Sequence, residues 1–533
     1  MSKYVVALVA FIFALTPFVL PGPANAKAVR DPSAAEEASF QSAQLAVAPG
    51  AASALADGAA RVAASDPALL ALFDASRRAD EERRALETVL ATLRAQGEPA
   101  RVRAGGVAID LERAVAEAGE KRARLVAAYP RFVALVDPDP LSISDVRALL
   151  KPREALVLIL PTERGTYVWA VTTETSRWSR ADVSATEVSG LADAVMRSLV
   201  VSSGRGAVDA ARRSGRAGRG FARDAAFRLY QALWSPIAAD LAGTDTVYVV
   251  ADGPLRSVPP GVLVTAPPQG RDDDPIALRA TPWLQRRHSF ALLPAVANLR
   301  VLENNTQGRR RGFAGFGDAN TEGYPNGSIS KSLPSLPQTR GELRQLARTL
   351  GGSRGSVRLG DAATEHALKS AELDDVSVLA LATHALVPIN NLGMPTGEAA
   401  LVFTPPAAVS GDDDGLLTTT EAARLRLNAD LVILSACDTG LDDPDAIGID
   451  SLSRAFFHAG ARALLVSNWR IRDDVAARLS TRAIQIAVHD RVSLAEALRR
   501  SALQMMDDQS DPGLAHPSNW AAFSLLGNGR GTL

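Results

Sequence analysis

The sequence predicts an α/β protein, with a mostly parallel sheet flanked by helices and preceded by an α-helical N-terminal region. From residue 247 onwards, strand-like and helix-like segments alternate, which is typical of a parallel sheet with covering helices. Residues 376–382 and 431–437 are largely apolar runs, as strands buried on both faces are. Residues 66–136 instead show the helical spacing of apolar side chains.

The bulk composition sets the broad class. A chain of 533 residues is too long for one ordinary domain, so we expect two or more. Hydrophobic residues make up 47% and charged residues 22%, which permits large cores. The formal net charge of −1 indicates no nucleic-acid ligand and no strongly acidic partner. Arginines cluster at 212–219 among glycines and at 309–311; short basic patches of this kind are weak motifs.

Residues 1–26 have the pattern of a secretory signal peptide. A positive start (Lys3) precedes the almost wholly apolar run 4–20, and an Ala-Asn-Ala cleavage site ends the segment. An uncleaved membrane anchor is the alternative, but the run is at the short end for a bilayer span and a proline interrupts it. We therefore expect an exported protein, periplasmic or secreted, with no stable membrane span after cleavage.

Residues 27–140 are predicted to form an α-helical region. A flexible start leads into helix, and apolar periodicity over 66–93 and again over 109–136 predicts an antiparallel helical hairpin. Glycine and proline between the two stretches mark the connection. The hairpin is similar to a piece of a helical-repeat array, although no clean internal repeat is present. Such a surface could bind a protein partner.

The second predicted domain, residues 141–533, begins after a Pro-Asp-Pro boundary. Its first elements alternate in type, and a polar turn between its two strands predicts a β-hairpin. In chain order we expect a short helix over 145–150, strands over 155–160 and 167–172, and helices over 185–200 and 221–241.

The remaining elements predict the parallel sheet. Each of three helices leads into an apolar strand, as βαβ units require. Thr339 and Glu342 have the spacing of a capping box. The expected strands cover 247–250, 312–317, 376–382, 431–437 and 463–467, and the expected helices cover 339–350, 363–373, 418–425, 452–459, 475–488 and 494–506.

His384 and Cys437 are the candidate catalytic residues. Each ends an apolar run, and Cys437 is the only cysteine in the chain. In open α/β sheets functional groups gather at the carboxyl ends of parallel strands, so the two side chains can meet in space. A histidine about 50 residues before a cysteine is also the spacing found in caspases. The alternative for a lone cysteine is a small buried hydrophobic residue.

This pair can perform nucleophilic catalysis. The thiolate attacks a carbonyl, and the imidazole accepts the thiol proton and later protonates the leaving amine. The tetrahedral oxyanion needs hydrogen-bond donors, and the backbone N–H groups of Ala385 and Cys437 are the natural candidates. The sequence identifies no third side chain that orients the imidazole.

These residues belong to a series of motifs that resembles the CHAT-domain family, relatives of caspases and separase. The motifs follow the family order, so that together they are far more specific than any one of them. The similar stretches are Val249–Pro259, Leu381–His384, Leu434–Gly440, Arg454–Arg462, Ser467–Trp469 and His516–Phe523.

The resemblance implies a caspase-like α/β fold and a cysteine endopeptidase that uses His384 and Cys437 on a protein or peptide substrate. The N-terminal helices resemble, less specifically, the helical-repeat partners of such domains. One position departs from the family pattern: glycine usually follows the histidine, whereas here Ala385 does. If the oxyanion loop required a positive φ, alanine would misplace its N–H group.

The resemblance also bears on specificity. The segment around Asp473 is similar to the separase segment whose aspartate lines the pocket for a basic P1 side chain, and a carboxylate would favour Arg or Lys there. The alternative is that Asp473 is the N-cap of a helix beginning near Val475. Glu398 and Asp450 are further candidate pocket acids.

No cofactor and no metal are predicted. The acidic run 412–414 is interpreted as a solvated loop because it lacks the ligand spacing of an EF-hand. Phosphate-loop, dinucleotide and zinc-peptidase motifs are missing from the sequence. The leading hypothesis is thus an exported cysteine endopeptidase. The alternatives are a non-catalytic interaction module and, less strongly, an acyl transferase.

Overall fold

The computed structural model describes residues 33–47, 67–95, 101–129, 140–200, 220–300, 312–322, 324, 333, 336–386, 398–410, 413–435, 448–469 and 471–533. The chain divides into two compact units. One unit comprises Met1–Ala51 and Pro140–Leu533, and the other comprises Ala52–Asp139. None of the helices in the described ranges is both long and apolar enough to cross a membrane.

The smaller unit contains the predicted helical hairpin, in which α3 (Pro67–Ala95) packs against α4 (Arg101–Ala128). Leu69 and Leu125 are among its buried side chains. Helix α4 begins earlier than expected, because Gly105 and Gly106 lie inside the helix and not in the connection. Each glycine costs about 1 kcal/mol relative to alanine in a helix, a cost that the pairing with α3 offsets.

A helix over residues 34–47 belongs to the larger unit. Phe40 is fully buried there, and the Gln44 side chain donates to the Leu141 carbonyl at 2.8 Å and accepts from its N–H group at 2.9 Å. The Glu37 carboxylate accepts from the N–H group of Ile143 at 3.0 Å. The sequence pattern groups this segment with the predicted helical region, whereas its contacts tie it to the sheet-containing unit.

The larger unit contains an eleven-stranded sheet in the order β3-β2-β1-β4-β5-β14-β13-β12-β8-β6-β7, and a three-stranded sheet in the order β11-β10-β9. The α/β fold class is therefore confirmed. The strands are β1 (Glu154–Thr162), β2 (Gly165–Thr172), β3 (Ser176–Ala181), β4 (Thr246–Ala251), β5 (Ser289–Leu292), β6 (Gly312–Gly317), β7 (Val357–Leu359), β8 (Val376–Ala382), β9 (Ala385–Leu386), β10 (Ala400–Val402), β11 (Leu416–Thr418), β12 (Leu431–Leu434), β13 (Ala463–Ser467) and β14 (Phe523–Gly527).

Nine strands of the large sheet form two parallel halves that run in opposite directions, and β2 and β3 extend the first half as antiparallel edge strands. Strands β1, β4, β5 and β14 are parallel to one another, and so are β13, β12, β8, β6 and β7. The halves meet where β14 pairs antiparallel with β13. The carboxyl ends of β8 and β12 therefore lie at one edge of the sheet, and those of β4 and β5 lie at the opposite edge.

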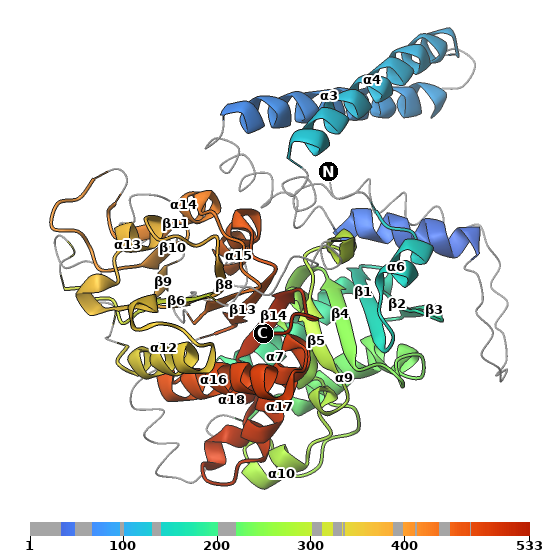
Figure 1. Ribbon diagram of the computed structural model, residues 1–533. Helices are drawn as coiled ribbons and strands as arrows, with labels where there is room; N and C mark the ends of the chain where they lie inside the picture. The colour runs from blue at the N-terminus through green and yellow to red at the C-terminus, as the bar shows by residue number, and fades with distance from the viewer. Residues whose placement is uncertain are drawn as a thin grey trace. The chain divides into compact units, whose positions relative to one another are not determined.

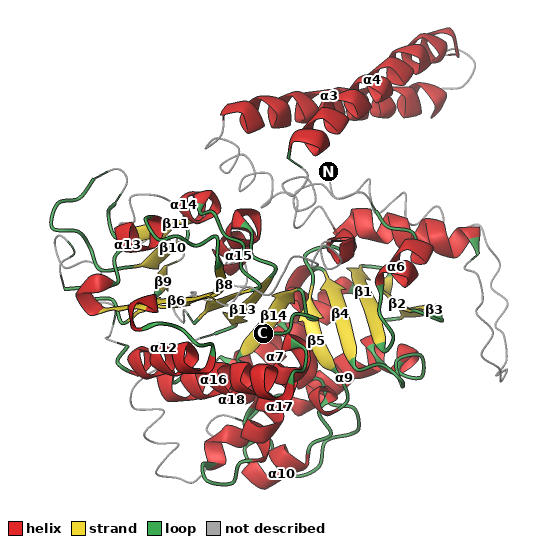
Figure 2. Ribbon diagram, viewed as in Figure 1, coloured by secondary structure: helices red, strands yellow, loops and turns green. Residues whose placement is uncertain are grey.

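Helices cover the faces of this sheet. Figures 1 and 2 show α12 and α16 below the half that contains β8 and β12, with α14 and α15 above it, whereas α17 packs against β5 and β14. The larger unit also contains, within the described residues, α6, α7, α9, α10, α13 and α18. The bounds of all these helices are α6 (Ile143–Leu149), α7 (Ala185–Leu199), α9 (Arg223–Leu233), α10 (Pro275–Ala280), α12 (Gln338–Thr349), α13 (Glu365–Lys369), α14 (Thr419–Arg424), α15 (Gly448–Ala459), α16 (Asp473–Asp490), α17 (Leu494–Asp507) and α18 (Pro517–Trp520).

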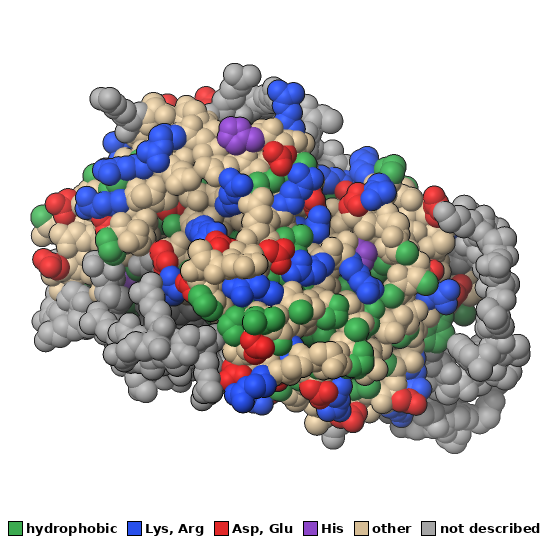
Figure 3. All heavy atoms as spheres, turned by 90° about the horizontal axis from the view of Figure 1, so that it is seen from below, with side chains coloured by type: hydrophobic (Ala, Val, Ile, Leu, Met, Phe, Trp, Pro, Cys, Tyr) green, Lys and Arg blue, Asp and Glu red, His purple; other side chains and the backbone are tan. Residues whose placement is uncertain are grey.

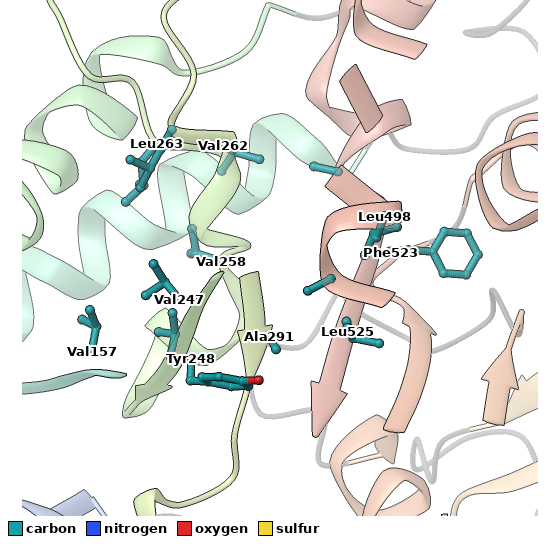
Figure 4. Packing of buried hydrophobic residues seen from close by; sticks show 14 of the residues in the cluster. Val157, Val247, Tyr248, Val258, Val262, Leu263, Ala291, Leu498, Phe523 and Leu525 are labelled. Atoms are coloured by element: carbon teal, nitrogen blue, oxygen red, sulfur yellow. The ribbon is translucent and has the colours of Figure 1, made fainter. Parts of the chain in front are cut away.

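The main hydrophobic core lies between the strands and these helices. In Figure 4 the side chains of Val157, Val247 and Ala291 from the first half-sheet lie in one cluster with Leu525 from β14 and Leu498 from α17. Three of these positions are completely buried. The last strand of the chain is thus part of the core that the first half-sheet builds, which fixes the junction between the two halves.

Candidate active site

The strand ends that precede the candidate dyad lie side by side. Strand β12 pairs parallel with β8 so that Leu434 is opposite Leu381, and the Ser435 N–H group donates to the Leu381 carbonyl at 3.0 Å. His384 and Cys437 each follow three residues after these paired positions. Residues 436–447, and Cys437 with them, lie outside the described residues. The structure therefore places His384 and the strand end that leads to the thiol.

His384 is held at the edge of the small sheet. Its side chain is largely buried, and its carbonyl accepts from the N–H group of Val402 in β10 at 2.8 Å. The hydroxyl of the preceding residue, Thr383, donates to the Val402 carbonyl. One bond from the His384 backbone and one from the Thr383 side chain thus hold this segment against β10, which places His384 at the carboxyl end of β8.

Ala385 adopts ordinary extended backbone in β9, and it is not among the residues with positive φ. It lies opposite Leu401 in an antiparallel ladder. Because the bond from Val402 to His384 flanks that position, Ala385 and Leu401 form a non-hydrogen-bonded pair. The Ala385 N–H group then points away from β10. The departure from glycine leaves both the backbone conformation and the candidate oxyanion donor intact.

Replacement of Ala385 by glycine is expected to change catalytic efficiency little, because no positive φ has to be accommodated. The extra backbone freedom should lower the free energy of unfolding by about 0.5–1 kcal/mol. Peptidase kcat/KM and thermal unfolding of the purified variant measure the two effects. A large rise in kcat/KM on substitution would show that this loop needs a conformation that alanine resists.

The three candidate pocket acids lie on separate elements. Glu398 precedes β10, and its carboxylate accepts from the backbone N–H group and the hydroxyl of Thr420 at 3.1 and 3.0 Å, at the start of α14. Asp450 lies in the first turn of α15. Asp473 is the first residue of α16. The bonds of Glu398 stabilise a helix terminus, a structural role that the sequence pattern does not reveal.

Helix α16 begins two residues earlier than expected, so Asp473 is not its N-cap; Arg472 is. The guanidinium of Arg472 binds Asp474 through two hydrogen bonds, at 3.0 and 2.6 Å, and reaches Asp511 at 3.0 Å. The alternative interpretation of Asp473 as a cap is therefore wrong. Its interpretation as a pocket acid stays a prediction.

Glu342 is a buried carboxylate beneath the strand end that leads to Cys437. It accepts from the Ser480 hydroxyl of α16 at 2.6 Å and from the Ser435 hydroxyl at 3.4 Å. The predicted capping box with Thr339 does not form, because the Thr339 hydroxyl donates to the Leu336 carbonyl. A sequence signal for burial exists, since Glu342 shares a helical face with Leu346, one turn later.

A second buried carboxylate, Glu365, holds the acidic segment. Its side chain is fully buried and accepts from the backbone N–H groups of Asp414 and Gly415 at 3.0 and 2.9 Å. Lys369 forms ion pairs with both Glu365 and Glu421. The predicted solvated loop is thus tied to α13 at its end. No cluster of metal-ligating side chains occurs within the described ranges.

Glu365 should make stability depend on pH. Burial raises the pKa of its carboxyl to about 7, from an ordinary value of 4.5. The folded protein holds this proton more tightly than the unfolded chain does. The resulting stabilisation is complete below pH 4.5 and is lost as pH rises through 7, by about 3 kcal/mol.

Glu365→Gln keeps an acceptor for the two N–H groups and removes the titration. The free energy of unfolding, measured by urea titration between pH 5 and 8, should fall with pH in the wild type and be flatter in this variant. Glu496→Gln is the control, because its ion pairs with Arg499 and Arg500 hold the pKa of that carboxyl below its ordinary value despite burial. A control profile as flat as that of Glu365→Gln would contradict the assignment.

The parallel half-sheet, with a buried histidine at one strand end and the single cysteine beyond the neighbouring strand, defines an α/β protein with a candidate peptidase-type site. Residues 223–528 match the family model of the CHAT domain. This match covers more than half of the chain, and the protein belongs to the CHAT-domain family.

The sequence is also similar to tetratricopeptide repeat protein 28. Identity to the mouse protein is 29% over 196 residues, which cover 32% of this chain and 8% of that protein. Identity to the human protein is 33% over 113 residues, which cover 21% of this chain and 4% of that protein. The chain thus spans only a small part of the length of these relatives.

Solved structures with a similar arrangement include the separase–securin complex of Saccharomyces cerevisiae, with a TM-score of 0.42, 9% identity, and coverage of 75% of this chain and 31% of that chain. Another, described as "Structure of Protease", has a TM-score of 0.32 at 12% identity and covers 58% of this chain and 68% of that chain.

Proposed function

We propose that this protein is an exported cysteine endopeptidase in which Cys437 is the nucleophile and His384 is the general base. One observation carries the proposal: β8 and β12 are adjacent and parallel, and the two residues follow at the same distance from the paired positions Leu381 and Leu434. Membership of the CHAT family supports the same pair, since both lie within the matched residues 223–528.

In the proposed reaction the two side chains act together with two backbone N–H groups. The Cys437 thiolate attacks the scissile carbonyl, and the oxyanion accepts hydrogen bonds from the backbone N–H groups of Ala385 and Cys437. His384 takes the thiol proton and transfers it to the leaving amine. Water then hydrolyses the thioester. The Ala385 N–H group supports this scheme because the β9–β10 ladder leaves it unused.

The proposed preference for a basic P1 residue is based on Asp473. The proposed export is based on the signal-peptide pattern of residues 1–26. A peptide-library cleavage profile of the purified protein tests activity and P1 preference together. Cleavage after Arg or Lys that weakens in Asp473→Asn supports the assignment. Cleavage without any preference at P1 would remove Asp473 from the pocket while leaving the dyad in place.

A non-catalytic interaction module is the second candidate. The helical hairpin favours it, because Val102 and Ile109 of α4 are 90% and 61% exposed and exposed apolar side chains often mark protein contacts. The discriminating measurement is the alkylation rate of Cys437, the only thiol in the chain. A thiol that iodoacetamide fails to modify in the folded protein, together with no cleavage of the library, favours the module.

A further inference from the structure

A polar groove lies in the helix layer that covers the candidate catalytic half-sheet. It is lined by residues of α12, α16 and α17 and has a volume of about 640 Å³. This volume is within the range of small-molecule binding sites. Its walls include Gln345 and Arg348 from α12, Arg478 and Arg482 from α16, and Gln504 from α17. Helices that pack only for stability usually face one another with apolar stripes; these helices face the groove with amides and guanidinium groups.

The charges around the groove do not cancel. Arg478 pairs with Asp508, and the groove residue Asp474 is already bound by Arg472. Arg482 donates to a neutral partner, the Gln504 amide oxygen, at 2.7 Å. Within the described parts of the chain no carboxylate pairs with Arg348 or Arg482. The groove therefore holds two guanidinium groups that form no ion pair with a described carboxylate, although the buried Glu342 carboxylate lies in its floor.

The two arginines of the groove are not part of an extended positively charged surface. The face in Figure 3 shows Lys and Arg side chains dispersed among Asp and Glu, so no extended basic surface explains the two arginines. The floor of the groove is formed by buried residues, among them Glu342 and Ser501. The Ser501 hydroxyl donates to the Leu479 carbonyl at 2.9 Å, and Ser480 bonds Glu342. The floor is thus satisfied internally, and the ligand-binding capacity lies with the arginines and glutamines above it.

We infer that this groove binds a small, multiply charged anion, with Arg348 and Arg482 as the charged contacts and the flanking glutamine amides as further donors. Planar guanidinium groups bind phosphate and carboxylate oxygens through paired, charge-assisted hydrogen bonds. The volume admits an organic diphosphate or polycarboxylate, and both share the chemistry of closely spaced anionic oxygens.

The groove also connects to the strand end that leads to Cys437. Glu342 is at once a floor residue of the groove and the acceptor for the Ser435 hydroxyl. A ligand that draws α12 and α16 together shifts the helix that carries Glu342. We therefore expect the bound anion to change the reactivity of Cys437, a consequence that rests on the proposed function.

Binding is tested first, with sodium pyrophosphate and, separately, citrate titrated into the full-length protein by calorimetry. Arg348→Gln/Arg482→Gln is expected to weaken binding of the preferred anion by about tenfold or more. Arg344→Gln/Arg358→Gln is the matched control, because both arginines are exposed and neither lines the groove. Equal binding by the two double variants, or no binding of either probe by the wild type at millimolar concentration, would overturn the inference. The probe that binds more tightly indicates whether the natural ligand is a phosphate or a carboxylate compound.

Coupling is tested by the rate at which iodoacetamide modifies Cys437 with and without the anion. The rate should change severalfold in the wild type and stay constant in Glu342→Gln, which keeps the groove arginines. Binding of the anion without a change in the alkylation rate would refute the coupling, while the inference of a binding site would still hold. Because calorimetry and alkylation need no turnover, an inactive enzyme and an unoccupied groove give different results.

Discussion

Cys437→Ala is expected to abolish peptide hydrolysis while leaving the fold intact. Removal of a catalytic nucleophile from a dyad or triad typically lowers kcat by about 10⁴-fold or more. The substitution deletes a single sulfur atom, and the adjacent strand is held by pairing of β12 with β8 and β13. Peptidase kcat/KM on a substrate from the library measures the loss, and thermal unfolding reports the fold.

His384→Ala should cause a loss of similar size, and the double variant should be no worse than either single one, because the two groups act as a unit. His366→Ala is the matched control, since that imidazole is exposed on α13. Unchanged turnover in Cys437→Ala would refute the proposed nucleophile. A double variant in which the two losses multiply would refute a shared step.

Among the substitutions proposed here, Arg530→Ala should cause the largest fall in the free energy of unfolding. The guanidinium binds the Glu154 carboxylate at 2.8 Å through Nε and donates to the Leu149 carbonyl at 2.7 Å through Nη2. It also lies over the Tyr248 ring, 5.8 Å from the centroid. The two paired side chains are only 16% and 10% exposed. Without Arg530 the carboxylate stays buried and uncompensated, which costs about 3 kcal/mol or more.

Arg153→Ala is the comparison for Arg530→Ala. Arg153 also forms a two-bond ion pair, with Asp245 at 2.5 Å, but its side chain is 65% exposed and that of Asp245 is 56% exposed. An exposed pair contributes about 1 kcal/mol or less. The free energy of unfolding, measured by urea titration, should therefore be clearly lower for Arg530→Ala than for Arg153→Ala. Equal losses would show that Glu154 finds another partner or becomes solvated.

The strands of the large sheet can be predicted where burial on both faces leaves a continuous apolar run. The segments 155–160, 376–382 and 431–437 are predicted in this way. The first two are strands in the structure, and in the third the strand covers Leu431–Leu434. The predicted hairpin of β1 and β2 is also confirmed. These assignments are possible because the side-chain pattern alone distinguishes a doubly covered strand from its flanking helices.

Short strands could not be predicted, because two or three residues carry no periodicity. Strands β9, β10 and β11 are of this length, and they exist because long-range pairing fixes them. The predicted helix 221–241 is too long: α9 ends at Leu233 and a 3-10 turn follows. Pro236 explains the end, since proline cannot donate the next helical hydrogen bond.

For the candidate site, the sequence predicts which residues lie at strand ends but not what lies beneath them. The positions of His384 and of the β12 strand end follow from apolar runs and sheet topology. The role of Glu342 depends on contacts with Ser480, 138 residues away along the chain. Local capping patterns describe neighbours in sequence, so a buried carboxylate that joins three distant elements is invisible to them.

The place of β14 in the sheet has a consequence for the order of folding. Residues 523–527 fill the gap between β5 and β13, so neither half can acquire its inner neighbour until this segment has been synthesised. A nascent chain that ends before Phe523 therefore holds two incomplete half-sheets, each with an unpaired inner edge. Such edges are open to pairing with other chains. The candidate site is thus assembled on a continuous sheet only late in synthesis.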